Sequence, residues 1–330
     1  MGLSRRSLTK ALLVLSAIIA VLVCSYIIIR SLETGNVEET RGTLDESFIS
    51  LKRIEYDGKR YVQNNQLTTL LLIGVDKEEQ ATGNGYRSGG QADFLLLTVI
   101  DDESKSVRFL QIDRDTMTNI TVLSVLGKKV GTRNAQICLS HGFGKTSEEN
   151  CQYTVEAVQN LLEGTDIELY MAFDLNAISA INDALGGVTV TLNDDLSHLD
   201  AAMVPGATIR LQGKQAEYFV RSRYGVGDGS NNERMGRQKA FMDGAFSLIR
   251  QNASDASYLN DLYDRISAYA TTNAAKSRIV SALSSAITYD VREIERLPGS
   301  HTLGSDGFME FHPDEEAVTK WILDVFYTPE

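Results

Sequence analysis

Four arginines fall within 17 positions of this sequence, and a glutamine follows them directly: Arg221, Arg223, Arg234, Arg237 and Gln238. The 330-residue chain carries a formal charge of −12, so a general affinity for polyanions is excluded. A guanidinium group stays ionised and donates to phosphate oxygens two at a time. The cluster therefore indicates a focused site for one compact, highly charged anion. A salt-bridged surface with scattered arginines is the alternative interpretation.

Three carboxylates, Asp76, Asp93 and Asp115, fall at the ends of predicted strands, where open α/β sheets bind ligands. Arg114 precedes Asp115 directly. Mg²⁺, with Mn²⁺ as the alternative ion, commonly takes one or two carboxylates together with phosphate oxygens. Arginines and a metal would together stabilise charge on a leaving phosphate. Simple pairing of the aspartates with the arginines explains the spacing equally well.

The local pattern predicts how the arginines are positioned. Tyr218–Arg223 is rich in aromatic and β-branched residues, which favours a strand with Arg221 and Arg223 on one face. The later arginines would lie at the start of a helix over Gln238–Arg250, near an N-terminus that also attracts anions.

The rest of the chain alternates between strand and helix patterns, which predicts a three-layer α/β sandwich with a central mixed sheet. The predicted strands are 68–75, 94–100, 107–112, 170–173 and 188–192, and the predicted helices are 151–162 with Ser147 as a cap, 176–185, 238–250, 258–270, 274–288 and a last one from about 312 to 326. Four prolines and the absence of repeats or linkers favour one domain over 67–330.

The first 30 residues have the pattern of a membrane anchor. Basic residues precede Ala11–Ile29, an uncharged run of 19 residues, long enough to span a bilayer. We predict a cytoplasmic tail (1–10), a transmembrane helix (11–30) and an extracellular stalk (31–66) with a short helix around Leu44–Ile54. A cleaved signal peptide is the alternative. An extracellular location in a single-pass membrane protein disfavours ATP and nicotinamide substrates, and the acidic exterior disfavours nucleic acid.

Cys138 and Cys151 lie 13 residues apart in the predicted extracellular part, whereas Cys24 lies in the predicted anchor. In an oxidising compartment such a pair forms a disulfide, and two buried free thiols are the alternative. His141, near Cys138, is interpreted as a structural loop residue.

Taken in order, several motifs resemble the LytR-CpsA-Psr family of bacterial envelope enzymes. They are Leu70–Asp76, Gln91–Phe94, Asp113–Thr116, Asp183–Val188, Val220–Arg223 with Arg234–Gln238, and Phe311–Glu316 near the end. Each motif is weak alone, but the set is specific. A single-pass anchor with its N-terminus in the cytoplasm also matches the family.

The resemblance implies a phosphotransferase that moves a glycopolymer (teichoic acid, capsule or another wall polysaccharide) from a polyprenyl-pyrophosphate carrier to peptidoglycan. It implies that Asp76 and Asp93 hold magnesium. The implied phosphate contacts are Arg114, Arg221, Arg223, Arg234 and Gln238, with Arg237 adjacent and Asp115 beside them. Either Asp93 or Asp115 would take the proton of the acceptor.

An apolar interior should accept the polyprenyl tail. Its lining would include Phe94, Phe173, Leu185 and Phe241, although we interpret these four as ordinary core residues.

Two positions depart from the family pattern. Gln91 replaces a phosphate-binding arginine, for which Arg87 is the nearest substitute, and Asn231 replaces an acid, with Asp228 nearby. Losing a charge-assisted hydrogen bond costs about 1.5–3 kcal/mol, which weakens binding without excluding activity. A polyprenyl-phosphate sensor without turnover, or a lipid pyrophosphatase that uses water as acceptor, are the competing functions.

Overall fold

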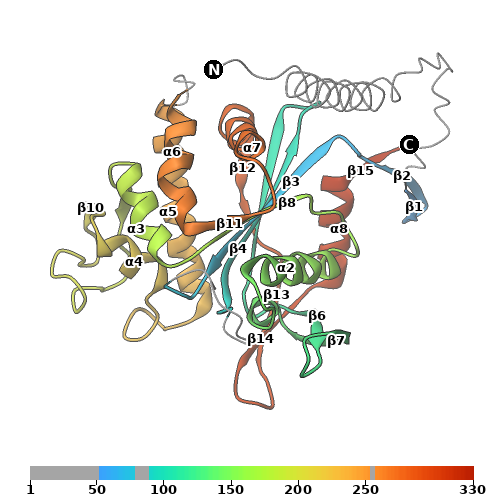
Figure 1. Ribbon diagram of the computed structural model, residues 1–330, viewed down its shortest axis with the longest axis horizontal. Helices are drawn as coiled ribbons and strands as arrows, with labels where there is room; N and C mark the ends of the chain where they lie inside the picture. Colours follow the sequence, from blue (N-terminus) through green and yellow to red (C-terminus); the bar gives the residue numbers. More distant parts are fainter. Residues whose placement is uncertain (1–51, 79–88, 253–256) are drawn as a thin grey trace, which may run out of the picture. The chain divides into compact units, whose positions relative to one another are not determined.

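The computed structural model describes residues 52–78, 89–252 and 257–330 (Figure 1). All of them belong to one compact unit, Leu51–Glu330. The predicted anchor, Cys24 and Arg87 lie outside the described residues. Within the described ranges, no helix combines the length and apolar character that a membrane span requires.

A six-stranded mixed sheet forms the centre of the fold, with the strand order β11-β8-β3-β4-β5-β12. In that order the strands are Ala270–Thr272, Leu169–Phe173, Leu67–Val75, Ala92–Asp101, Ser106–Ile112 and Asp290–Glu295. β3, β4 and β5 are antiparallel neighbours, whereas β8 runs parallel to β3 and β12 parallel to β5. The predicted α/β fold with a central mixed sheet is confirmed.

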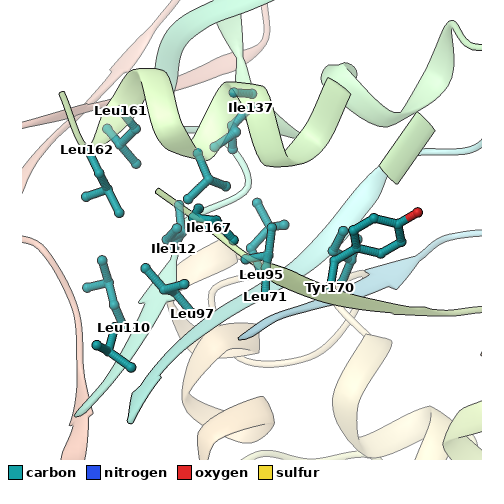
Figure 2. Packing of buried hydrophobic residues seen from close by; sticks show 14 of the residues in the cluster. Leu71, Leu95, Leu97, Leu110, Ile112, Ile137, Leu161, Leu162, Ile167 and Tyr170 are labelled. Atoms are coloured by element: carbon teal, nitrogen blue, oxygen red, sulfur yellow. The ribbon is translucent and has the colours of Figure 1, made fainter. Parts of the chain in front are cut away.

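Helices cover both faces of this sheet (Figure 1). They are α2 (Ser147–Leu161) and α8 (Glu315–Phe326) on one face, and α5 (Asn231–Asn252), α6 (Tyr258–Ile266) and α7 (Lys276–Thr288) on the other. Because side chains alternate along β3, Leu71 belongs to the cluster beneath α2 (Figure 2), while Leu70 belongs to the cluster that includes Phe246 and Ile249 of α5. Each fully buried leucine side chain contributes about 2 kcal/mol to stability, so burial of these leucines fixes which face of β3 each residue takes. This in turn fixes which side chains at the end of the strand face the site.

Smaller elements surround this core. They are β1 (Arg53–Tyr56), β2 (Lys59–Gln63), β6 (Met117–Leu123), β7 (Lys129–Gln136), η2 (Ile137–Gly142), α3 (Asn176–Ala184), β9 (Thr189–Thr191), β10 (Thr208–Arg210), α4 (Lys214–Arg221), η3 (Ser267–Tyr269), β13 (Gly299–Leu303), β14 (Met309–Pro313) and β15 (Tyr327–Pro329). β1 and β2 form a sheet with β15, so residues 53–63, expected in the stalk, are part of the folded unit. Residues 31–51 of the predicted stalk, with most of its predicted helix, lie outside the described residues.

The strand predicted over Tyr218–Arg223 is wrong, because the chain is helical up to Arg221. Phe219 and Val220 are buried in an apolar cluster with β9 and α5, and Glu217 pairs with Arg221 one helical turn later at 2.5 Å. Good helix formers before Tyr218 and this tertiary burial outweigh the local aromatic and β-branched content.

Three predicted boundaries also need correction. α5 begins at Asn231 rather than Gln238, so the later arginines lie inside the helix and not before it. The side chain of Thr146, not Ser147, accepts the capping hydrogen bond of α2. The helix predicted over 258–270 ends at Ile266, and the chain then enters β11.

Candidate functional site

The carboxylates expected at strand ends meet at one edge of the sheet. Asp76 follows β3, Asp93 lies near the start of the antiparallel β4, and Asp115 follows β5. Gly74 allows β3 and β4 to approach there, since a Cβ at this position would lie 2.9 Å from the Cβ of Phe94. The sheet therefore brings together three residues that are far apart in the sequence.

A cleft of about 1230 Å³ opens over this edge. Its sheet wall consists of Asp76, Gln91, Asp93, Arg114 and Asp115. Its helical wall consists of Glu217, Arg221, Arg223 and Asp228, from α4 and the loop before α5. Arg234 of α5 also lines the cleft. Three of the four clustered arginines and all three aspartates therefore share one cavity.

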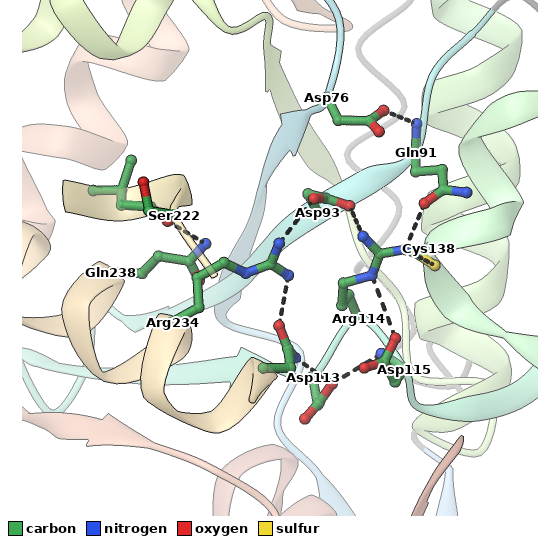
Figure 3. Close-up of polar contacts among 12 residues, drawn as sticks. Asp76, Gln91, Asp93, Asp113, Arg114, Asp115, Cys138, Ser222, Arg234 and Gln238 are labelled. Carbon is green, nitrogen blue, oxygen red and sulfur yellow. Dashed lines mark hydrogen bonds and ion pairs between the residues drawn. The ribbon is translucent and has the colours of Figure 1, made fainter. Parts of the chain in front are cut away.

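Asp93 joins the two sides, lying between the guanidinium groups of Arg114 and Arg234 (Figure 3). Its Oδ1 accepts from Nη1 of Arg114, and its Oδ2 accepts from Nη1 of Arg234 at 3.0 Å. The two arginine side chains are only 12% and 4% exposed. Their Nε atoms make no hydrogen bond within the described residues. One carboxylate thus holds two largely buried cations in place.

Arg221 and Arg223 reach the cleft differently. Arg221 ends α4 with its side chain 43% exposed, paired with Glu217. Arg223 follows α4, and no hydrogen bond or ion pair of its side chain is found within the described ranges. Both line the cleft as expected, but a helix end and a loop place them there, not the alternation of a strand.

Arg237 and Gln238 are not among the described residues that line the cleft. The guanidinium of Arg237 donates to the carbonyls of Phe219 (2.9 Å) and Ser222 and pairs with Asp194. Gln238 donates to the carbonyl of Val220 at 3.4 Å. Both side chains therefore satisfy carbonyls at the C-terminus of α4, and so position the element that carries Arg221.

Burial and neighbouring charge shift the titration of this site. Burial lowers the pKa of Arg234; Asp93 opposes that shift, and the cations Arg223 and Arg114 lower it further. Burial and Asp113 raise the pKa of Asp115 against the effect of the same arginines. Arg234 is therefore close enough to Arg223 and Arg114 to be repelled by both, and a bound anion would relieve that repulsion.

Asp76 suits an oxygen-binding divalent ion, whereas Asp93 would have to share with the ion the oxygens that accept from Arg114 and Arg234. Burial raises the pKa of Asp76; the Gln91 backbone N–H opposes this, and repulsion from Asp93 adds to it. Two carboxylates that repel each other in this cleft match the one or two that Mg²⁺ uses. No cluster of three or more His, Cys, Asp or Glu suited to a metal occurs in the described part of the chain, so a closed metal cage is not available there.

An apolar cavity of about 210 Å³ adjoins the cleft. Its lining includes the four residues interpreted as core on sequence: Phe94, Phe173, Leu185 and Phe241. The cleft and the cavity share Asp76, Asp93, Arg221 and Arg234. The volume of the apolar cavity is below the roughly 300–1,000 Å³ of drug-sized ligand pockets. Without movement of its walls, the cavity would therefore enclose only the first part of a long apolar chain.

The predicted disulfide is wrong, because Cys138 and Cys151 are both free and buried. Sγ of Cys138 accepts from Nη2 of Arg114 at 3.2 Å, and Sγ of Cys151 lies 3.8 Å from Nε2 of His141. Burial raises the pKa of the two thiols to about 11 and about 12, so both stay protonated near neutrality. Each sulfur therefore has its own polar partner instead of the other sulfur.

The two departures from the family pattern gain a structural explanation. Gln91 accepts a hydrogen bond from Arg114, so it orients an arginine rather than replacing one. Asn231 accepts from Arg234 and donates to Oδ1 of Asp113 at 2.7 Å. An amide can make both bonds, whereas an acid here would face the carboxylate of Asp113.

Sequence reasoning missed a polar layer behind the cleft. The buried Asp113 also accepts from Nε2 of His301 on β13 at 2.9 Å. Gln136 of β7 donates to Asp115 at 3.2 Å. The Asp113–Thr116 motif was a usable signal for Asp113. Nothing local marks His301, because a β-hairpin 188 residues away brings it to this motif.

The chain is 24% identical over 235 residues to the polyisoprenyl-teichoic acid–peptidoglycan teichoic acid transferase TagU of Bacillus licheniformis, covering 66% of this chain and 68% of that protein. It is 26% identical over 250 residues to the cell wall biosynthesis protein LcpA of Corynebacterium glutamicum, covering 68% of this chain. The match spans 44% of LcpA, less than half of its length.

Among solved structures, B. subtilis TagV matches with a TM-score of 0.58 at 22% identity, covering 79% of this chain and 97% of TagV. TagT bound to LI-WTA matches with a TM-score of 0.59 at 16% identity, covering 79% and 91% of the two chains. At these identities the likeness establishes the fold. The model of the LytR_cpsA_psr family matches residues 27–322, which confirms the resemblance seen in the sequence. With its arginine-lined cleft at the edge of a mixed sheet, the chain therefore belongs to the LytR_cpsA_psr family.

Proposed function

We propose that this chain transfers a phosphate-linked glycopolymer from a polyprenyl-pyrophosphate carrier to a hydroxyl of peptidoglycan. The observation that carries the proposal is the junction of the charged cleft with the apolar cavity, at Asp76, Asp93, Arg221 and Arg234. A lipid pyrophosphate has the same two parts, a charged head beside an apolar chain. Family membership and the transferase activity named for TagU also support the proposal.

In this mechanism the protein mainly binds and orients. Arg114 and Arg234 are already held by Asp93, so they would meet pyrophosphate oxygens with little reorganisation. Arg221 and Arg223 would approach from the opposite wall. The acceptor oxygen bonds to the phosphorus that bears the glycan, the bridging P–O bond breaks, and lipid monophosphate leaves with its charge held by the guanidinium groups. Mg²⁺ held by Asp76 and Asp93 would neutralise further phosphate charge.

The test is a transfer assay with purified protein, a lipid-pyrophosphate glycan, peptidoglycan fragments and Mg²⁺. We expect a new glycan–peptidoglycan phosphodiester, lost on chelation and restored by Mg²⁺. Arg114→Ala should abolish transfer, whereas Arg292→Ala, an exposed arginine on β12 that lines no described cleft, should not change it. Pyrophosphate cleavage without linkage would identify a pyrophosphatase instead. Tight lipid binding with no cleavage would identify a sensor.

We also propose that residues 11–30 hold the chain in the cell membrane with the folded unit outside, as the basic flank and uncharged run favour. Externally added protease should then degrade the folded unit in intact protoplasts. Complete protection, with degradation after lysis, would contradict this topology.

A further inference from the structure

The proposed transfer requires a group that removes the proton of the acceptor hydroxyl, and three of the four carboxylate oxygens of the two aspartates considered on sequence already contact other groups. Both oxygens of Asp93 already bind guanidinium groups. Oδ1 of Asp115 accepts from Gln136 at 3.2 Å and lies 3.4 Å from Nε of Arg114. Lone pairs directed at cations and donors are less available to a hydroxyl proton.

His301 lines the same cleft and is held as a base would be. Its side chain is 36% exposed, while Asp113, which it contacts, is only 7% exposed. Since a carboxylate oxygen accepts, Nε2 of His301 carries the hydrogen in the 2.9 Å bond to Oδ2 of Asp113. The lone pair is then on Nδ1, for which no hydrogen-bond partner is found within the described ranges.

The neighbours of this pair fix its geometry. Oδ1 of Asp113 accepts from the backbone N–H of Asp115 at 2.9 Å and from Asn231 at 2.7 Å, so the carboxylate cannot rotate freely. The ring of Phe311 packs on that of His301, with centroids 4.7 Å apart. The imidazole is therefore oriented from both sides.

The β13–β14 hairpin (Figure 1), which carries His301, is hydrogen-bonded to residues that line the cleft. The backbone N–H of Phe311 donates to the carbonyl of Asp115 at 2.8 Å. Gln136 donates to the carbonyl of Met309 at 2.6 Å. These bonds tie the hairpin to the segment that contains Arg114, so the imidazole and the phosphate-binding arginine keep a fixed relation.

From this arrangement we infer that His301 is the general base of the transfer reaction and that Asp113 is its positioning residue. The inference rests on the proposed function. The acceptor hydroxyl gives its proton to Nδ1 of His301 while its oxygen bonds to the glycan-bearing phosphorus. The bridging P–O bond breaks and its electron pair stays on the lipid monophosphate. The imidazolium then loses its proton to solvent, and Asp113 stabilises it until it does.

Other charged groups lie around His301. Asp113 and Arg296 line a small pocket with it, and Asp115 and Asp306 line the cleft with it. Glu310 lies on the paired strand β14, where it binds His312 at 3.1 Å. His312 is therefore the matched control: a histidine with a carboxylate partner on the same hairpin but outside the cleft lining among the described residues.

The experiment compares single-turnover transfer by the wild type, His301→Gln and His312→Gln, with lipid-pyrophosphate binding measured separately. We expect His301→Gln to slow transfer about 100-fold, in the range typical of a lost general base, with unchanged lipid affinity. His312→Gln should match the wild type. The acidic limb of the pH–rate profile should vanish in His301→Gln, and added imidazole should partly restore transfer by His301→Ala.

Asp113→Asn tests the positioning role. It should move the acidic limb to lower pH, because an amide stabilises an imidazolium less than a carboxylate does, while thermal melting confirms the fold. If His301→Gln transferred the glycan as fast as the wild type does, the inference would be overturned while the proposed function stood. The same would follow if the acidic limb of the pH–rate profile were lost in His198→Gln or Asp115→Asn and kept in His301→Gln. No transfer by folded wild type would overturn the proposed function, and the inference with it.

Discussion

The sheet wall of the cleft holds its charged side chains in fixed contacts, whereas the helical wall presents two arginines with few partners. Arg114 on the sheet wall binds Asp93 and Gln91 and is 12% exposed. Arg221 on the helical wall is 43% exposed and has an ion pair with Glu217. Buried, shared carboxylates preorganise one wall, and exposure leaves the other free to adapt. The two walls should therefore respond differently to mutation. Changes in the sheet wall should lower the stability of the fold and the rate of transfer, whereas changes in the helical wall should lower the affinity for lipid pyrophosphate.

The largest effect is expected where the buried contact between Arg234 of α5 and Asp93 of the sheet wall is broken. Arg234→Met keeps most of the side-chain volume but removes a guanidinium from Asp93, and should lower the free energy of unfolding by about 3 kcal/mol. Transfer should fall at least 100-fold, on the order expected for losing a preorganised electrostatic contact. Urea denaturation and the transfer assay measure these effects. Arg292→Met is the control, and an Arg234→Met protein as stable as wild type would contradict the contrast between the walls.

A second effect tests the packing behind the sheet wall. Burial lowers the pKa of His141 from 6.5 to about 4, and its Nδ1 lies 2.9 Å from the carbonyl of Gly89. Because the unfolded chain binds this proton more readily, the stability that neutral His141 provides is complete above pH 6.5 and is lost as pH falls toward 4. The loss is about 3 kcal/mol.

Unfolding in urea at pH 7 and at pH 4.5 measures it. His141→Gln should lose less stability over this interval than the wild type, and the exposed His312→Gln should behave as the wild type does. Equal losses in all three proteins would show that His141 is not the group responsible.

A smaller effect is expected on the helical wall. Arg223→Ala should weaken lipid-pyrophosphate binding by about 1.5–3 kcal/mol, or roughly 10–100-fold, through lost charge-assisted hydrogen bonds. Its stability should change by less than about 0.5 kcal/mol, because no described partner loses a contact. Isothermal titration and thermal melting separate the two quantities. If Arg223→Ala markedly lowered the stability of the fold, Arg223 would behave like the residues of the sheet wall instead.

The smallest effect concerns the apolar cavity between the sheet and the helices. Ile181→Trp on α3 should fill part of it and exclude about two CH₂ groups of a lipid chain, which costs about 1.6 kcal/mol or roughly tenfold in affinity. Binding of inorganic pyrophosphate should not change, because the cleft is untouched. Reduced binding of both ligands would mean that the substitution disturbs the arginines.

Much of the fold followed from periodicity. β3, β4 and β5 and helices α2, α3 and α7 fall close to their predicted positions, because each has a long apolar pattern that local burial obeys. α4 did not follow, since its aromatic residues suit a strand locally and only packing with β9 and α5 makes them helical. The short strands β6, β7, β13 and β14 had no strong apolar alternation to reveal them.

Within the site, residue type predicted which side chains gather but not what each one does. Asp76, Asp93, Arg114, Arg221, Arg223 and Arg234 share the cleft as expected. Arg237 has the same chemistry and motif, yet it binds the carbonyls that end α4. Cys138 and Cys151 had the spacing of a disulfide, but their sulfurs bind Arg114 and His141. These outcomes depend on the direction of each side chain, which spacing does not encode.

The sequence by itself determined the family, the mixed α/β architecture and the arginines and aspartates that meet, because residue chemistry and apolar periodicity are local properties. The tertiary structure alone decided that Asp93 is shared by two guanidinium groups, that an apolar cavity adjoins the cleft, and that a hairpin brings His301 to Asp113. Those contacts join residues up to 188 positions apart. Their distances follow from strand order and helix packing, which no local pattern specifies.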